Sequence, residues 1–155
     1  MRARGFTIIE LVTVLVIVGA LAVFVVPRLN PEGFDRYGFR QEVLSAARYA
    51  QKTAMASGCE VQLFADAAAD SVALNYRSGG DDRDCGPSTN AFTEPVQNPG
   101  SSGPFVLNAP SGVDITSGGT VVFDGYGDPD NGLMIDFATD PDIEIEAVTG
   151  YAHEV

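Results

Sequence analysis

Basic residues are missing from the second half of this 155-residue sequence: the last of its nine Lys and Arg residues is Arg83. Twelve of the 21 Asp and Glu residues follow it, and the formal net charge of the chain is −12. A protein that binds a nucleic-acid backbone must replace condensed counterions with Lys and Arg side chains. The second half of the chain has no such side chain, so we do not expect it to bind nucleic acid.

The residues that carry most enzyme and metal chemistry are also scarce. His153, near the end of the chain, is the only histidine, and Ser111-Gly112 lacks the flanking glycine of a nucleophile elbow. Cys59 and Cys85 are the only cysteines, without the second pair or the clustered histidines of a zinc site. We therefore predict no catalytic residue, no enzyme activity and no cofactor.

One acidic segment keeps a metal alternative open. Asp124, Asp128 and Asp130 lie close together, and carboxylates at that density suit calcium. However, Asp128 to Gly132 is also a common turn composition, and the distal glutamate of an EF-hand loop is missing. We expect a turn here and keep the three aspartates as weak metal candidates.

Long apolar runs are limited to one, at the N-terminus. Residues 6–26 contain only three polar members, Thr7, Glu10 and Thr13, and as a helix they would extend about 32 Å, enough for a hydrocarbon core of about 30 Å. Arg2 and Arg4 precede the run, which places the short N-terminus in the cytoplasm and the rest of the chain outside. In that oxidising compartment the cysteine pair predicts a Cys59–Cys85 disulfide.

Three interpretations of this run remain open on composition. A secretory signal peptide would be cut near Ala20-Leu21-Ala22, but the run is longer than a usual apolar signal region. A plain membrane anchor tolerates the length but leaves Glu10 unexplained, since an acidic side chain near the centre of a spanning helix costs roughly 2.5 to 3.5 kcal/mol on insertion scales. The third interpretation gives Glu10 a partner, since a charge kept at that cost usually has one.

The segment RG-FTIIE resembles the prepilin leader of type IV pilins and type II secretion pseudopilins. That resemblance implies cleavage between Gly5 and Phe6 by a membrane peptidase, N-methylation of Phe6, and pairing of Glu10 with the terminal amine of a neighbouring subunit. Gly19 and Pro27 stand where the family has a helix-weakening glycine and a kinking proline. The resemblance predicts a leader over residues 1–5 and a transmembrane, filament-core helix over residues 6–29.

A second helical segment is expected over residues 30–58. Asn30 and Pro31 form a helix start, apolar residues recur at spacings of three and four, and Gly58 ends the pattern. The expected buried positions are Phe39, Val43, Ala46, Ala47, Ala50 and Ala54. Four basic residues recur on another face, as either a solvated surface or a contact with acidic groups of a neighbouring subunit: Arg36, Arg40, Arg48 and Lys52.

Residues 59–155 are expected to form a β-rich body with an irregular loop over residues 77–104. The spacing predicts short, turn-separated strands over residues 60–64, 72–77, 105–107, 113–116, 120–124, 133–138 and 143–148. The fold class is therefore α+β, with a long N-terminal helix packed on antiparallel sheets, and the prepilin resemblance implies a pilin-like fold.

Three further motifs narrow the resemblance: ARYAQ in the second helix, the Phe-x-x-x-Gly segment from Phe123 to Gly127, and Thr149-Gly150. They are similar to the GspH/FimT group of minor pilins and pseudopilins. The ending TGYAH and the cysteine pair are closest in appearance to minor pilins of mannose-sensitive haemagglutinin pili (MSHA-type, MshC-like). Some members of the FimT group bind DNA through C-terminal arginines, which the tail of this chain lacks.

The resemblance implies a minor pilin or pseudopilin of a Gram-negative bacterium, a structural or assembly-initiating subunit of a type IV pilus or a type II secretion pseudopilus. The alternative is a tip-located minor pilin that binds a ligand, as an adhesin or DNA receptor. The implied location is the inner membrane, with the body periplasmic, followed by a filament. The implied partners are other pilins or pseudopilins, the prepilin peptidase, the assembly platform and membrane lipid.

Overall fold

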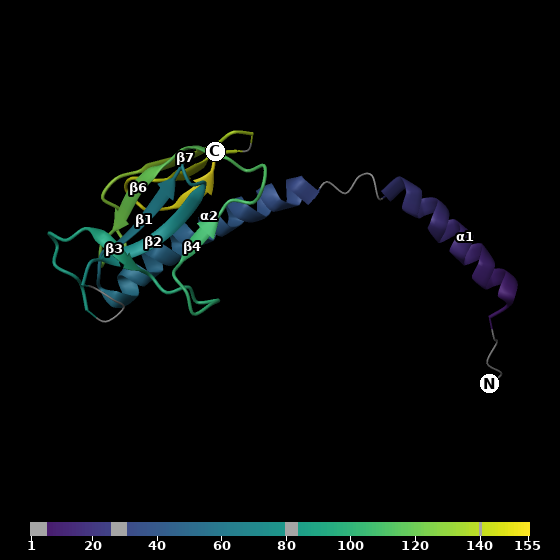
Figure 1. Ribbon diagram of the computed structural model, residues 1–155, viewed down its shortest axis with the longest axis horizontal. Coiled ribbons are helices and arrows are strands. Elements are labelled where there is room, and N and C mark those ends of the chain that lie inside the picture. The colour runs from purple at the N-terminus through teal and green to yellow at the C-terminus, as the bar shows by residue number, and fades with distance from the viewer. Residues whose placement is uncertain (1–5, 26–30, 80–83, 140) are drawn as a thin grey trace. The chain divides into compact units, whose positions relative to one another are not determined.

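Helix α1 spans Ile8–Val25, within the helix predicted over residues 6–29. The computed structural model describes residues 6–25, 31–79, 84–139 and 141–155 (Figure 1). The chain divides into two compact units, Met1–Phe34, which contains α1, and Asp35–Val155. Among the described residues, no helix is both long enough and apolar enough to cross a membrane. Pro27, the predicted kink, lies outside the described residues.

Helix α2 spans Pro31–Ser57 and begins three residues before the start of the apolar pattern at Phe34. Proline suits the first helical position because its missing N–H has no helical partner there. The N–H of Gly58 donates to the carbonyl of Ala54 (2.8 Å), which completes the last turn. All six positions expected on the buried face are buried: Phe39, Val43, Ala46, Ala47, Ala50 and Ala54.

The first sheet is antiparallel, and β1 lies between β2 and β6. β2 pairs on its other side with β3 at one end and with β4 at the opposite end. The strands are β1 (Val61–Asp66), β2 (Ser71–Arg77), β3 (Phe92–Pro95), β4 (Val106–Asn108) and β6 (Gly119–Phe123).

The second sheet is also antiparallel, in the order β5-β7-β8-β9. Its strands are β5 (Ile115–Ser117), β7 (Leu133–Phe137), β8 (Ile143–Ile145) and β9 (Ala152–Glu154).

The core of the body lies between α2 and the sheets. Alternate residues of β1 and β2 are buried, as the two-residue period of a strand requires when one face packs inward. At the second sheet, the ring of Phe39 in α2 meets the ring of Phe137 in β7 edge to face at 6.3 Å. Figure 1 shows α2 running behind the strands. The predicted α+β arrangement, helix on antiparallel sheets, is confirmed.

Each predicted strand overlaps an observed one, but two observed strands were missed. β3 lies inside the predicted irregular loop; its residues are mostly exposed and end at Pro95, so it has no alternating pattern. β9 has three residues, and its pairing with β8 defines it. The strand predicted over 143–148 ends at Ile145, because a turn closes where the N–H of Gly150 donates to the carbonyl of Glu146 (2.9 Å).

Candidate functional site

The first turn of α1 is closed by a reciprocal cap between Thr7 and Glu10. The Thr7 N–H and hydroxyl both donate to Oε2 of Glu10 (2.9 and 2.7 Å), and the Glu10 N–H donates to the Thr7 hydroxyl (3.3 Å). This is a capping box, which satisfies N–H groups that have no partner at a helix start. The role of Thr7 was not predicted, although the Thr-x-x-Glu spacing of a capping box is present in TIIE.

The third polar residue of the apolar run is also satisfied within the helix. The hydroxyl of Thr13 donates to the carbonyls of Ile9 and Glu10, at 2.9 Å each. The apolar side chains around it are exposed, with Phe6 and Ile8 at 85% and 84%. Over residues 8–21, α1 therefore presents exposed apolar side chains and polar side chains that are bonded locally, and large exposed apolar surfaces are typical of interaction sites.

Two further predicted positions bear on this segment. A Cβ at Gly19 would meet no atom within 4 Å, so packing with the described residues does not require a glycine there. Gly5, the predicted cleavage residue, lies outside the described residues, and Phe6 is the first that the structure describes.

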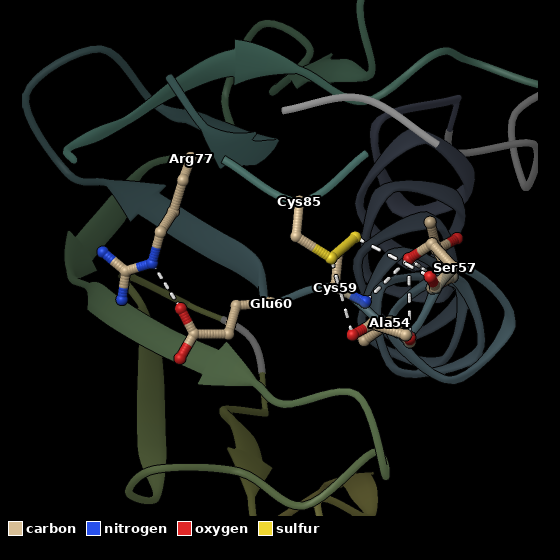
Figure 2. The surroundings of a disulfide bond; sticks show 8 residues. Ala54, Ser57, Cys59, Glu60, Arg77 and Cys85 are labelled. Carbon is tan, nitrogen blue, oxygen red and sulfur yellow. Dashed lines mark hydrogen bonds and ion pairs between the residues drawn. A yellow bond between two sulfur atoms is a disulfide. The ribbon is translucent and has the colours of Figure 1, made fainter. Parts of the chain in front are cut away.

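The predicted disulfide between Cys59 and Cys85 is confirmed. The two sulfur atoms are 1.99 Å apart and the Cα atoms 5.1 Å apart. Cys59 follows the end of α2, and its N–H donates to the hydroxyl of Ser57 (3.2 Å) (Figure 2). The bond therefore ties the segment around Cys85 to the point where α2 leads into β1.

Arg77 holds the same segment from the other side. Its Nε forms an ion pair with Glu60 beside the disulfide (Figure 2), and its Nη1 donates to the carbonyl of Asn90 (2.7 Å). The guanidinium carbon lies 4.2 Å from the ring centroid of Phe92, a cation–π distance. The described part of the predicted irregular loop is thus anchored at Cys85, Asn90 and Phe92.

Removal of the disulfide should cost about 3 kcal/mol of unfolding free energy, because the bridge closes a loop of 26 residues in the unfolded chain. We expect the double variant Cys59→Ser/Cys85→Ser to unfold at a lower denaturant concentration than the oxidised native chain. A thiol reductant should lower the midpoint of the native chain and leave that of the double variant unchanged. Equal midpoints for oxidised and reduced native chain would contradict the expectation.

Three of the motifs that carry the family resemblance meet at one side chain, Gln51 of the ARYAQ segment. Its Nε2 donates to the carbonyl of Gly127 (2.9 Å) and to that of Thr149 (3.0 Å). Gly127 ends the Phe-x-x-x-Gly segment, and Thr149 opens the Thr-Gly turn. Gln51 therefore fastens two turns, distant in sequence, to the same side of α2.

Gly127 and Gly150, the two glycines at this junction, have backbone conformations that favour glycine and leave little room for a side chain. Gly127 and Gly150 have φ angles of +88° and +66°, in the region that favours glycine. A Cβ on Gly127 would lie 2.9 Å from the side chain of Met55, and one on Gly150 would lie 2.8 Å from the ring of Phe123. The glycines of the Phe-x-x-x-Gly and Thr-Gly motifs are therefore needed because two turns pack closely at α2.

Replacing Gln51 with alanine should lower the free energy of unfolding by about 1 to 3 kcal/mol, because two carbonyl groups lose their side-chain donor. Gln41→Ala is the matched control: Gln41 lies on the same helix but donates once, to the exposed carboxylate of Glu154 (3.0 Å). We expect a smaller loss in the control when both variants are unfolded with denaturant. Equal losses would show that Gln51 is no more than a surface residue.

The aspartate-rich segment is a turn. Oδ1 of Asp124 accepts the N–H groups of Tyr126 (2.8 Å) and Asp128 (3.0 Å), and Oδ1 of Asp130 accepts the N–H of Val122 (2.8 Å). Over the described part of the chain, no three metal-ligating side chains are grouped closely enough to hold an ion.

The sole histidine lies at the second sheet. Its ring stacks on Tyr151 at 5.4 Å, and Nε2 lies 3.8 Å from the carboxylate of Glu144. His153 is half-buried.

The basic face of α2 is partly used within the chain, and the solvated-surface interpretation is wrong for Arg40. Arg40 is 8% exposed, and its Nε lies 3.4 Å from Glu154 in β9. Arg48 donates to the carbonyl of Ala152 at 3.5 Å. Lys52 is exposed and has no hydrogen bond or ion pair with the residues that the structure describes.

Comparison with solved structures assigns this chain a pilin-like fold. It is similar to the type IV minor pilin FimU of Pseudomonas aeruginosa in one crystal form, with a TM-score of 0.52 and 8% identity over 80% of this chain and 90% of that chain. A second crystal form of the same protein gives a TM-score of 0.50 and 7% identity over 77% and 91%. No family model matches the sequence, and no curated protein matches it.

Proposed function

We propose that this chain is a minor pilin or pseudopilin, a non-enzymatic subunit of a type IV pilus or a type II secretion pseudopilus. The observation that carries the proposal is α1: an uncovered apolar helix with a carboxylate in its first turn, in a chain whose body has a pilin-like fold. In this role the leader is cut between Gly5 and Phe6, Phe6 is N-methylated, and α1 passes from the inner membrane into the filament.

The local hydrogen bonds of the polar side chains in α1 support the proposal that this helix lies first in lipid and then in the filament core. Unsatisfied polar groups are costly where no water can reach them. The bonds made by Thr7, Glu10 and Thr13 within the first turns satisfy the two hydroxyl groups and lower that cost for an isolated subunit, while the charge of Glu10 still requires an opposite charge.

Within this role, an assembly-initiating subunit with an MSHA-type character is the finer proposal. It rests on the C-terminal sequence motifs and the cysteine pair: the Cys59–Cys85 disulfide is present, and Gln51 bonds to the Phe-x-x-x-Gly segment at Gly127. A DNA receptor is disfavoured, since residues 84–155 carry twelve acidic and no basic residues.

Sequencing the exported protein from its amino end tests the proposal. We expect Phe6 to be the first residue and to carry an N-methyl group, because the leader would be removed at Gly5. A mature protein that begins at Val23 would indicate an ordinary signal peptidase, and one that begins at Met1 would indicate an uncleaved anchor. Either result would contradict the proposal.

A further inference from the structure

A groove runs along one flank of α2. Two hollows of about 820 and 390 Å³ both border Tyr49 and Lys52. Along the helix the lining extends from Ser45 to Ser57, thirteen residues whose ends are about 18 Å apart at the rise of an α-helix. The opposite wall is formed by residues 94–97 together with Pro99 and Phe105. We call this the α2 groove.

The wall of the α2 groove is held in place by packing and hydrogen bonds. The ring of Tyr49 stacks on Phe105 at 5.3 Å, and its hydroxyl donates to the carbonyl of Gln97 (3.3 Å). The N–H of Val96 donates to the carbonyl of Leu74 (3.0 Å), which ties the same wall to β2. The groove is therefore a preformed feature of the body.

The charges in the groove select an acidic occupant. Lys52 borders both hollows and has no partner among the described residues, and the exposed Arg48 borders the smaller hollow. Glu94, which borders the larger hollow, is the one acidic residue in the described lining of these two hollows. A solvent-exposed ammonium between apolar walls attracts a carboxylate and orients the chain that carries it.

The shape of the groove selects an extended peptide over a sugar. About five extended residues at 3.3 Å each cover 18 Å. A sugar would need an open aromatic face, but Tyr76 is only 4% exposed and one face of the Tyr49 ring is covered by Phe105.

We infer that the α2 groove binds an extended, acidic segment of a neighbouring filament subunit, with a carboxylate of that segment at Lys52. The inference rests on the proposed function, which supplies the neighbour. It adds where the contact lies and what chemistry the neighbour presents there. It also identifies Lys52 as an exposed cation of the basic face that forms no hydrogen bond or ion pair with the described residues and can contact another subunit.

A photo-crosslinking experiment on the full chain in its producing cells tests this inference. A photoreactive amino acid replaces Ala56, which is exposed, lines the groove and lies one turn from Lys52; the control position is Glu42, exposed on the same helix and outside the lining. We expect an adduct from position 56 and none from position 42. Mass spectrometry of the adduct should identify a crosslinked peptide of another protein that contains Asp or Glu.

Charge variants make the result specific to Lys52. Lys52→Glu should reduce the adduct from position 56 by at least roughly tenfold, while Lys52→Arg should retain it, because the attraction depends on charge. Raising the salt concentration should also reduce the adduct. An adduct that is insensitive to Lys52→Glu, that joins two copies of this chain, or that contains no acidic residue would overturn the inference.

The same sample separates failure of the inference from failure of the proposed function. A chain that begins at Phe6 and enters filaments but gives no adduct from position 56 would overturn the groove inference and leave the proposed function standing. A chain that keeps its leader and stays out of filaments, yet gives the Lys52-dependent acidic adduct, would support the acidic occupant and contradict the proposed function.

Discussion

Glu10→Ala should leave the chain inserted and cleaved but strongly reduce its entry into filaments. On the proposed function, the carboxylate of Glu10 pairs with the terminal amine of a neighbouring subunit in an apolar environment. A charge left alone there costs roughly 2.5 to 3.5 kcal/mol on insertion scales, which corresponds to roughly 100-fold in the assembly equilibrium. The measurement is the ratio of filament-bound to membrane-bound protein at equal expression.

The capping box supplies a control that separates two roles of Glu10. Thr7→Ala removes the side-chain partner of Glu10 but retains the carboxylate. It should cost about 1 kcal/mol of helix stability, as the loss of an N-terminal cap usually does. If Glu10 acts by pairing between subunits, Thr7→Ala should enter filaments at close to the native level. Equal loss in both variants would show that Glu10 serves only to cap α1.

Gly5→Ala should abolish cleavage of the leader. The proposed peptidase must bring the peptide bond between residues 5 and 6 into its active site, and a side chain at residue 5 adds bulk next to the bond that is cut. We expect almost all of the variant to remain in the membrane with its five leader residues attached, as measured by the mass of the intact protein.

Arg4→Ala is the matched control for this variant, because it changes the adjacent residue without adding a side chain to the glycine. It should be cleaved to a mature protein of native mass. Normal cleavage of Gly5→Ala would refute the leader assignment, and loss of cleavage in both variants would show that the effect is not specific to a side chain at residue 5.

Local pattern in the sequence accounted for most of the secondary structure. The apolar spacing in α2 identified all six expected core positions, because a helix buries one stripe and the spacing of that stripe is set by 3.6 residues per turn. The strands with alternating burial were predicted for the same reason. β3 and β9 were missed because their formation depends on pairing with β2 and β8 and leaves no pattern of its own.

Some features of the candidate site could also be predicted from the sequence. Cys59–Cys85 was predictable because the sequence has two cysteines, which allow one pairing within the chain. The cap on Glu10 was also readable from Thr7, since the two residues are neighbours on one turn.

Neighbouring residues alone determine the apolar N-terminal helix, the buried face of α2 and the cap between Thr7 and Glu10, so these features follow from the sequence. What only the tertiary structure decided depends on groups far apart along the chain. Gln51 donates to the carbonyls of Gly127 and Thr149, and Arg40 pairs with Glu154, 114 residues away. Lys52 borders a groove and forms no hydrogen bond or ion pair with the described residues. The partners of these polar groups cannot be predicted from local sequence, because a buried donor or charge bonds to the acceptor that lies next to it only in the folded chain.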